Sequence, residues 1–480
     1  MTMGWLSLVP AVLAGYWFVR AWRPSCLSRT GWFYRLCELC LGTGAGLGIA
    51  SCLFFLLVWA ELARPLTIVA VELVCAALAF FAARRRGRTG NLLPSAPAPV
   101  TAGTWLLRAG GALALVLLIA GWYWTTQASP YGDWDAFAIW NLRAKYLASG
   151  SEGWRNAVTG DVGGGHLGAA HPDYPLLLCA LVGHAWRLDG NTSPWTPAII
   201  GLLFSLLTPM LLLASLAGLR GETVGWLALL LLVSSESFVS QSASQYADIP
   251  LAFYALGAVA LLASSEQQSG NRPLYAWSGF FAALAAWTKN EGLVFLLLVL
   301  VWVACRKGLR ALVASALGAL PVALVVAAFK GLLAPVTVGL FPSTLSGWIE
   351  KLTEPGRWVL IATSYGRNAW ELGFWWAQPL VLALLWLWAA GRAERQQIRV
   401  AWAGAIPLAM LAAGFAVYLV TVADLRWHLS TSSNRIWLQM WPSLLLCLFL
   451  LGRPPAVQVG VSPVPKAHRS KKPGRRKPSA

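Results

Sequence analysis

The chain alternates between long apolar runs and short polar segments. Most of the apolar runs are long enough for a helix to cross the ~30 Å hydrocarbon core of a bilayer. The pattern therefore predicts an all-α polytopic membrane protein with about 13 transmembrane helices. The runs span residues 3–19, 41–63, 66–83, 105–123, 196–218, 224–240, 248–264, 276–288, 292–305, 311–330, 374–391, 400–422 and 436–451.

Three apolar segments are too short to cross a bilayer alone. We predict that the neighbouring runs 276–288 and 292–305 form two helices that meet at a polar turn below the membrane surface. Pro175 to Leu188 is also short, and it ends near His184 and Arg187. We predict an interfacial helix there, because a crossing would invert every basic loop that follows.

Composition and charge placement support this class of protein. Hydrophobic residues make up 58% of the 480 residues and charged residues only 12%, with a mean hydropathy of +0.61. Soluble domains carry roughly 25% charged residues. The net charge of +18 does not indicate a nucleic-acid partner, because Lys and Arg gather in short loops and in the tail from Lys466. The main basic loops contain Arg84, Arg85, Arg86 and Arg88; Arg306, Lys307 and Arg310; and Arg392, Arg395 and Arg399.

Basic loops face the cytoplasm, which predicts an amino terminus outside and a carboxyl terminus inside. Three outer regions result, 124–195, 331–373 and 423–435. In the first of them, Asp133 and Asp135 follow the fourth apolar run and precede an amphipathic segment. A carboxylate there can act as a general base or hold a divalent cation, and a helix cap is the simpler alternative. We expect lipid to contact Ala136, Ile139, Trp140 and Leu147, and a polar cavity to be lined by Asn141, Arg143 and Lys145.

Polar groups also mark the starts of later helices. His171 and Asp173 precede the predicted interfacial helix, where a proline-bounded helix start is the simpler interpretation. Asp248 begins an inward-going run. An acid at that depth costs free energy unless it is paired or faces a wet cavity. A helix cap with Pro250 in the first turn is the simpler alternative for Asp248.

The remaining candidates are mostly cations. Lys289 and Glu291 lie in the polar turn between the two short runs, where they can also simply pair with each other. Arg426 and Arg435 precede the last run. The planar fork of arginine suits a phosphate, and snorkelling towards water is the alternative.

The order of these pieces resembles the GT-C superfamily of integral-membrane glycosyltransferases. The nearest branch contains the protein O-mannosyltransferases, the lipid A aminoarabinose transferases and bacterial dolichyl-phosphate-mannose-transferase-like proteins. The resemblance covers residues 105–300, and His171 stands where some relatives have lysine. The motifs are Asp133-Trp-Asp135, His171-Pro172, Ala247-Asp248-Ile249-Pro250 and Thr288-Lys289-Asn290-Glu291-Gly292.

The resemblance implies inverting transfer of a sugar from a polyprenyl-phosphate donor to a hydroxyl of a glycan, lipid or protein. It implies an active site on the outer face of a bacterial cytoplasmic membrane, with Mg²⁺ or Mn²⁺ as the one cofactor left open. Residues 105–451 would form the catalytic membrane domain, 1–104 a transmembrane extension and 452–480 a disordered basic tail. The implied base is Asp135, supported by Asp133, and Asp248 would orient the base or acceptor. The implied contacts of the donor phosphate are Lys289, Arg426, Arg435, Arg143 and Lys145, and the other site residues are His171, Asp173 and Glu291.

A transporter or lipid flippase is the alternative class. Many spans, the intramembrane Glu72 and the short paired runs also suit a carrier. Against it, the sequence shows no inverted repeat, and five of the 19 acidic residues lie in 124–174. A metal-dependent hydrolase that uses His166, His171 and Asp173 is a third, weaker alternative, because their spacing matches no standard ligand set.

Overall fold

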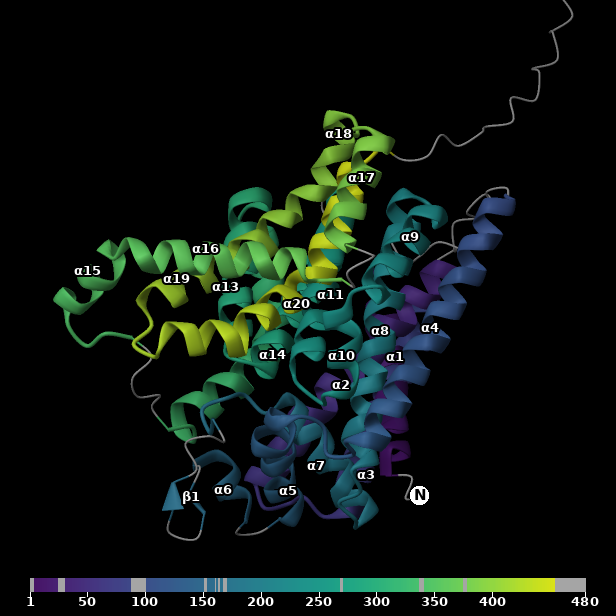
Figure 1. Ribbon diagram of the computed structural model, residues 1–480. Helices are drawn as coiled ribbons and strands as arrows, with labels where there is room; N and C mark the ends of the chain where they lie inside the picture. Colours follow the sequence, from purple (N-terminus) through teal and green to yellow (C-terminus); the bar gives the residue numbers. More distant parts are fainter. Residues whose placement is uncertain are drawn as a thin grey trace, which may run out of the picture.

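The computed structural model describes a helical protein, shown in Figure 1. Among the described residues, the exceptions to helix and loop are β1 (Asp161–Val162) and β2 (Gly165–His166), which pair as a short antiparallel hairpin. The structure describes residues 4–24, 31–87, 101–150, 153–159, 161–162, 165–166, 171–267, 271–335, 341–373 and 378–453.

The helices of the first half surround the predicted first outer region. Their bounds are η1 (Gly4–Leu8), α1 (Val9–Ala21), α2 (Trp32–Trp59), α3 (Pro65–Gly87), α4 (Ala102–Ala128), η3 (Ala136–Trp140), α5 (Asn141–Ser149), α6 (Gly153–Thr159), α7 (Leu177–Asp189), α8 (Trp195–Arg220), α9 (Glu222–Val233) and α10 (Glu236–Ala243). Those of the second half are α11 (Asp248–Gln267), α12 (Arg272–Thr288), α13 (Glu291–Lys307), α14 (Leu309–Leu332), α15 (Leu345–Thr353), α16 (Pro355–Trp370), α17 (Pro379–Ala390), α18 (Arg395–Ile398), η5 (Arg399–Gly404), α19 (Ala405–Val420) and α20 (Leu425–Leu451).

Among the described residues, 8 helical segments are long and apolar enough to cross a bilayer, and the pair α9–α10, bent by 67°, raises the number to 9. The other predicted runs that the structure describes lie on shorter helices, which include α1, α12, α13 and α17. The all-helical fold is therefore confirmed, and these helices fit a multi-pass membrane protein. The count of 13 spans stays a prediction.

Several helices have Lys or Arg near the terminus that lies at one end of the bundle. We call this end the basic end. There Arg86 donates to the carbonyl of Ala21 at 3.2 Å, and Arg108 pairs with Glu222 at 2.6 Å. Lys307 pairs with Glu266 at 3.0 Å across the ends of α11 and α13. Figure 1 shows α9, α17 and α18 towards this end, and α5, α6 and α7 at the opposite end, the loop end. The described parts of the three main basic loops thus lie on a common side, and Arg88 and the predicted disordered tail from residue 454 lie outside the described residues.

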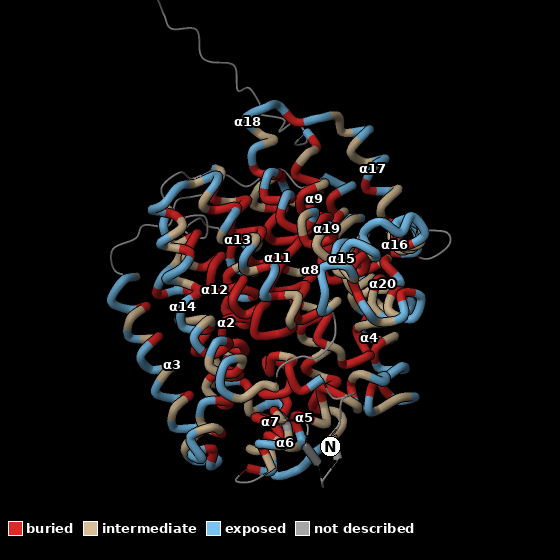
Figure 2. Tube along the Cα trace, turned by 90° about the vertical axis from the view of Figure 1, so that its left-hand side faces the viewer, coloured by how far each residue is buried: buried red, intermediate tan, exposed pale blue. Residues whose placement is uncertain are grey.

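Two short elements of the predicted first outer region are buried in protein. All ten residues from Leu177 to Trp186 of α7 are buried, so protein and not lipid surrounds this helix. The prediction of lipid contact for the segment after Asp135 is wrong too, because those four side chains lie in the protein core. They are Ala136, Ile139, Trp140 and Leu147. In Figure 2 the buried residues of α5 and α7 join the buried centre of the bundle.

The amino-terminal segment shares that core. Tyr254 of α11 donates to the carbonyl of Gly44 in α2 at 3.0 Å, and Ser51 donates to the carbonyl of Leu177 at 2.9 Å. Residues of 1–104 therefore pack inside the same hydrophobic cluster as 105–451. The two predicted regions therefore share one hydrophobic core.

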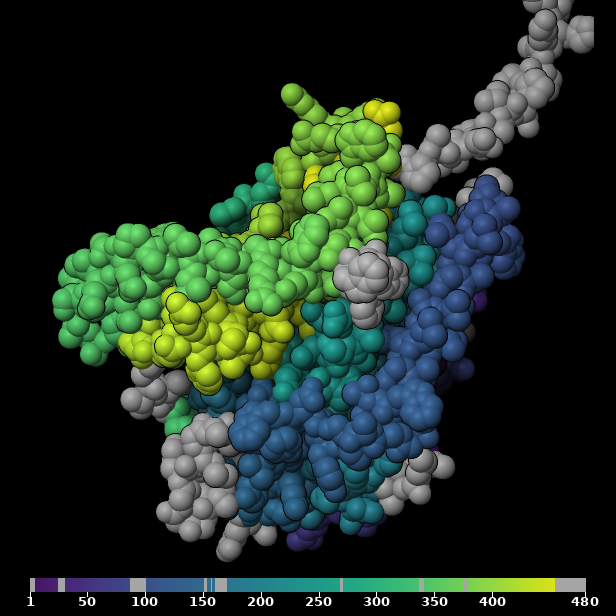
Figure 3. All heavy atoms as spheres, viewed as in Figure 1, coloured from purple at the N-terminus to yellow at the C-terminus, as the bar shows by residue number. Residues whose placement is uncertain are grey.

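Parts of the second and third predicted outer regions form a lateral shelf, made of α15, α16 and the start of α20. None of the residues of α15 is buried, and α16 buries only Arg357 and Ile361. The Arg357 guanidinium donates to the carbonyls at the end of α19, at 2.8 Å from Leu419 and Tyr418 and 3.1 Å from Thr421. Those carbonyls lack helical partners, so Arg357 fastens the shelf to the bundle. Figure 3 shows the shelf projecting beyond the helices below it.

Glycines allow a close helix crossing between α12 and α14. A Cβ at Gly318 would lie 1.9 Å from the carbonyl oxygen of Ala276, and one at Gly279 would lie 1.9 Å from that of Ser315. Small residues allow membrane helices to approach closely. We expect Gly318→Ala to lower the free energy of unfolding by about 1–3 kcal/mol, because α14 must move away from α12.

Gly331 is the matched control on the same helix, since a Cβ added there would meet nothing within 4 Å. Gly331→Ala should leave stability unchanged or raise it slightly, because alanine favours helix more than glycine does. Equilibrium unfolding in mixed micelles measures both variants. Equal stability of the two variants would show that the crossing is looser than described.

Candidate functional site

A fully buried carboxylate, Asp248, forms the centre of the candidate site at the start of α11. Its Oδ1 accepts hydrogen bonds from Lys289 Nζ at 3.0 Å and from Gln439 Nε2 at 2.6 Å. Its Oδ2 accepts from Arg435, 2.9 Å from Nε and 2.8 Å from Nη2. Two cations and an amide thus offset the cost of burying this charge. Of the two ways to accommodate a buried acid, pairing and a wet cavity, this structure shows pairing.

Arg435 connects Asp248 to Asp135, which is 113 positions earlier in the sequence than Asp248. Arg435 Nη1 lies 2.6 Å from Asp135 Oδ2, and the guanidinium carbon lies 4.7 Å from the ring centroid of Tyr246. Asp135 makes no side-chain cap bond to η3, so a helix cap does not describe it. Its side chain is 19% exposed, whereas that of Asp248 is 0% exposed. Of the two carboxylates, Asp135 is therefore the one that a substrate can reach.

The hydroxyl of Tyr246 contacts the backbone of Asp135. It accepts a hydrogen bond from the backbone N–H of Asp135 at 3.2 Å. Burial raises the pKa of Tyr246 to about 12, so the phenol stays neutral at physiological pH. The neighbouring Asp133 is exposed, and its Oδ2 accepts from the Ser244 hydroxyl at 2.6 Å. The two aspartates of the motif therefore have different partners, and Asp133 is outside the ionic cluster.

The turn between α12 and α13 has the predicted position and joins two polar clusters. Lys289, buried in the turn, contacts Glu291 at 3.0 Å as well as Asp248. The next residue, Asn290, donates to Asp173 Oδ2 at 2.7 Å. Its own Oδ1 accepts from Lys330 Nζ at 2.6 Å, and Lys330 also donates to the Asp173 carbonyl. Lys289 and Glu291 of this turn thus belong to the cluster around Asp248, and Asn290 between them belongs to the cluster of Asp173 and Lys330.

Tyr174 lies beside both clusters. Its ring stacks on His171, with centroids 4.6 Å apart, and on Trp140, with centroids 5.8 Å apart. Burial, with the nearby carboxylates of Glu291 and Asp173, raises the pKa of Tyr174 well above its usual range. Among the described residues the Tyr174 hydroxyl has no hydrogen-bond partner. It is also not one of the fully buried polar atoms that lack a partner. A neutral phenol therefore lies beside the site within an aromatic stack.

Other predicted residues are placed away from the ionic cluster or have structural roles. The buried Arg143 donates to the carbonyls of Pro172 at 3.0 Å and Tyr174 at 2.8 Å, so it shapes the turn that carries Tyr174. Burial lowers the pKa of Arg143. Lys145 is exposed. Arg426 is also exposed, and it lies nine residues before Arg435 on α20, roughly 13 Å along the helix axis. These three residues are not part of a cationic clamp in this structure.

Four residues of the site were not predicted from the sequence: Gln439, Asn290, Lys330 and Tyr174. Gln439 and Lys330 each had a detectable signal, because each is a polar residue within or at the end of an otherwise apolar run. Asn290 and Tyr174 lie inside motifs that were singled out for their charged neighbours. Nothing in the sequence alone indicated which neighbour of a charged residue would face the site.

A divalent cation needs several oxygen ligands at one point. Within the described part of the chain, no group of three or more His, Cys, Asp or Glu side chains converges in that way. Asp135 and Asp248 instead share Arg435. The arrangement therefore offers a carboxylate and cations to a substrate, and it assigns no residues to a metal.

Comparison with family models, with curated proteins and with solved structures finds no match to this chain. The function is therefore inferred from the site itself.

Proposed function

We propose that this protein is a glycosyltransferase that transfers a sugar from a polyprenyl-phosphate donor to an acceptor hydroxyl, with inversion. The observation that carries the proposal is the convergence of separate motifs. Asp135, Asp248, Lys289 and Arg435 come from four distant segments and form one ionic cluster. Three of these segments are the motifs that carry the resemblance to GT-C enzymes, and a mere set of helix caps would not bring them together.

In the proposed reaction, Asp135 removes the proton of the acceptor hydroxyl as its oxygen attacks the anomeric carbon. The bond between that carbon and the phosphate oxygen breaks, and its electron pair leaves with the lipid phosphate. Inversion follows because the acceptor attacks the face opposite to the leaving group. Asp133 lies next to this base and keeps a supporting role through Ser244.

Arg435 connects proton uptake by Asp135 to the negative charge that develops on the leaving phosphate. Asp135, Asp248 and Glu291 carry one negative charge more than Lys289 and Arg435 together. When Asp135 takes a proton, its hold on Arg435 weakens at the moment when the phosphate gains negative charge. Arg435 is then available to stabilise the leaving phosphate, where an arginine can donate two parallel hydrogen bonds, and Lys289 adds its positive charge from beside Asp248.

The orientation and finer architecture belong to the same proposal. If the basic end faces the cytoplasm, the site lies towards the opposite, outer side of a bacterial cytoplasmic membrane. The 13 predicted runs would then all be spans, with the bent pair α9–α10 and the 17-residue helices α12 and α13 beside the site. A glycan, lipid or protein acceptor would enter from the loop end, and the donor tail would lie in lipid.

Sugar transfer by the purified protein tests the proposal. The protein is mixed with polyprenyl-phosphate mannose or polyprenyl-phosphate aminoarabinose and with a pool of outer-surface lipids and glycans, and glycosylated product is measured by mass spectrometry. Product that depends on both donor and protein supports the proposal. Donor that stays intact with every acceptor in the pool would overturn it.

Tyr174→Phe tests whether the unpartnered phenol contacts substrate. The ring stack on His171 and Trp140 is kept, so we expect a normal fold and a turnover about tenfold lower, the value of one hydrogen bond in a protein. Tyr131→Phe, whose side chain is exposed in the loop between α4 and η3, is the control tyrosine and should match the wild type. Wild-type turnover of Tyr174→Phe would remove this residue from the site.

One observation favours the transporter alternative. Glu72 of α3 lies 2.9 Å from His184 Nε2 of α7, and both side chains are almost fully buried. A titratable pair inside a membrane protein often marks an ion pathway. Counterflow of labelled lipid in proteoliposomes without any bond formation, abolished by Glu72→Gln, would favour a carrier over a glycosyltransferase.

A further inference from the structure

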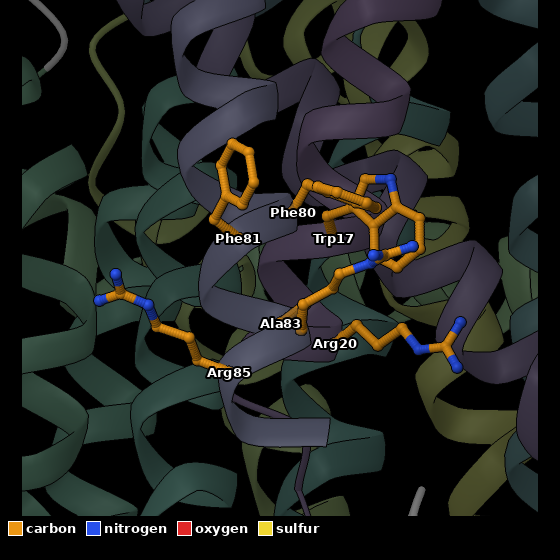
Figure 4. Close-up of a pocket in the computed structure, with 7 residues that line it drawn as sticks. Trp17, Arg20, Phe80, Phe81, Ala83 and Arg85 are labelled. Atoms are coloured by element: carbon orange, nitrogen blue, oxygen red, sulfur yellow. The ribbon is translucent and has the colours of Figure 1, made fainter. Parts of the chain in front are cut away.

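A second charged site lies at the basic end, on the outer surface of α1 and α3. A pocket of about 650 Å³ is formed there by two neighbouring helices that the proposed reaction does not use. None of its seven lining residues is acidic, three are arginines and three are aromatic. Figure 4 shows the pocket, which is lined by Trp17, Arg20, Phe80, Phe81, Ala83, Arg84 and Arg85.

The arginines of this pocket retain positive charge for a ligand. Arg84 and Arg85 are exposed and have no ion-pair partner in the described part of the chain. The Arg84 guanidinium lies 4.8 Å from the centroid of the Phe80 ring, and that of Arg20 lies 5.5 Å from the Trp17 ring. An arginine held over an aromatic face still presents the N–H groups of its edge to an anion.

Glu38 only partly offsets Arg20. Its Oε1 is 4.0 Å from Arg20 Nε but 2.6 Å from Arg23 Nη2, so Arg23 is its main partner. The Arg20 side chain is 41% exposed, and it donates to the neutral Tyr16 hydroxyl at 2.8 Å. The pocket therefore keeps an excess of positive charge.

An apolar stripe leads from the pocket along α3. Val74, Leu78 and Phe81 are 57%, 66% and 61% exposed. Together with Arg85 they follow one another at intervals of four, three and four residues, so they lie on one face of the helix. Figure 4 shows Phe81 and Arg85 on the same side of α3. Because α3 is long and apolar enough to cross a bilayer, this stripe runs along the hydrocarbon side of the helix. A ligand that fits both features has an anionic head and apolar chains.

We propose that this pocket binds the phosphate of an anionic glycerophospholipid, with the acyl chains lying along Val74, Leu78 and Phe81. Basic pockets between membrane helices are typical sites for anionic lipid head groups. The apolar stripe favours a lipid over a free phosphate ion, because a free ion has no apolar part that could contact the stripe. The absence of an acid among the seven lining residues favours an anionic lipid over a zwitterionic one, whose ammonium group would have no partner. This proposal does not depend on the proposed glycosyltransferase activity.

Native mass spectrometry of the full chain, titrated with phosphatidylglycerol in detergent, tests the site. The variant Arg20→Gln, Arg84→Gln, Arg85→Gln should bind the first lipid about tenfold or more weakly. The matched control is Arg310→Gln, Arg392→Gln, Arg395→Gln, which removes the same charge from exposed positions at the basic end but outside the pocket. The control should stay within about twofold of the wild type, as expected for charges that make no specific contact.

Two further arms separate the sources of the phosphate. Phosphatidylcholine should bind the wild type and the pocket variant alike, and inorganic phosphate should not displace phosphatidylglycerol. A photoactivatable phosphatidylglycerol should crosslink to peptides of α1 and α3. Equal losses in the pocket and control variants, displacement by inorganic phosphate, or crosslinks confined to other helices would each overturn the proposal.

Discussion

Asp248→Asn is expected to lower the free energy of unfolding by about 3–5 kcal/mol, the usual cost of removing one partner from a buried ion pair. Lys289 and Arg435 would keep their positive charges in a buried site without the carboxylate that they share. Gln439 would also lose a charged acceptor at 2.6 Å. Sugar transfer should disappear with the cluster, because both proposed phosphate contacts lose their anchor.

Equilibrium unfolding in mixed micelles measures this effect. Asp133→Asn is the matched control, since Asp133 is exposed and accepts one hydroxyl bond from Ser244, and its cost should stay near 1 kcal/mol, about the value of a single hydrogen bond. The double variant Asp248→Asn, Lys289→Met should lose less than the sum of the two single variants, because the unpaired cation is gone. Strict additivity would show that the ion pair is not coupled as described.

Asp135→Asn should lower the turnover of sugar transfer by about 10²–10⁴-fold, the range that a general base contributes. Asparagine has nearly the shape of aspartate and can still accept a hydrogen bond from Arg435, but it cannot take up the acceptor proton. Because Asp135 is partly exposed and Asp248 still pairs with Arg435, the fold should remain close to that of the wild type.

Turnover is measured with labelled donor at saturating acceptor, and thermal unfolding is measured alongside it. Asp133→Asn should lower turnover only severalfold, because its partner is Ser244 and not the ionic cluster. A loss of turnover in Asp135→Asn without a change in unfolding temperature supports its role as the base. Turnover at the wild-type level in both variants would show that neither aspartate is catalytic.

The motifs predicted some parts of the site better than others. The sequence indicates that Asp248 needs either a partner or a wet cavity, and the structure supplies Lys289, Arg435 and Gln439 as its partners. The polar turn at Lys289 also lies where two short apolar runs placed it. Arg143 differs, because its charge suggested a ligand contact while its burial leads it to backbone carbonyls. Charge indicates that a residue needs partners, but it does not indicate which ones.

The amphipathic segment after Asp135 shows a second limit of sequence reasoning. Its apolar face was expected to meet lipid, and instead Ile139 and Trp140 pack in the core beside α7. Apolar periodicity states only that one face of a helix avoids water. In a membrane protein, lipid and the protein interior both satisfy that requirement, so the pattern cannot distinguish them.

The sequence by itself determined that the chain is helical, which segments are apolar, and that its basic loops share one side, because these properties depend on local composition and on single charges. Only the tertiary structure decided that Asp135, Asp248, Lys289 and Arg435 form one ionic cluster, that α7 is buried in protein, and that Tyr174 stacks on His171 beside the cluster. Those contacts join residues up to 300 positions apart. They depend on which helices pack together, and in this chain close approaches at small residues such as Gly279 and Gly318 set that packing, at positions that no motif marks.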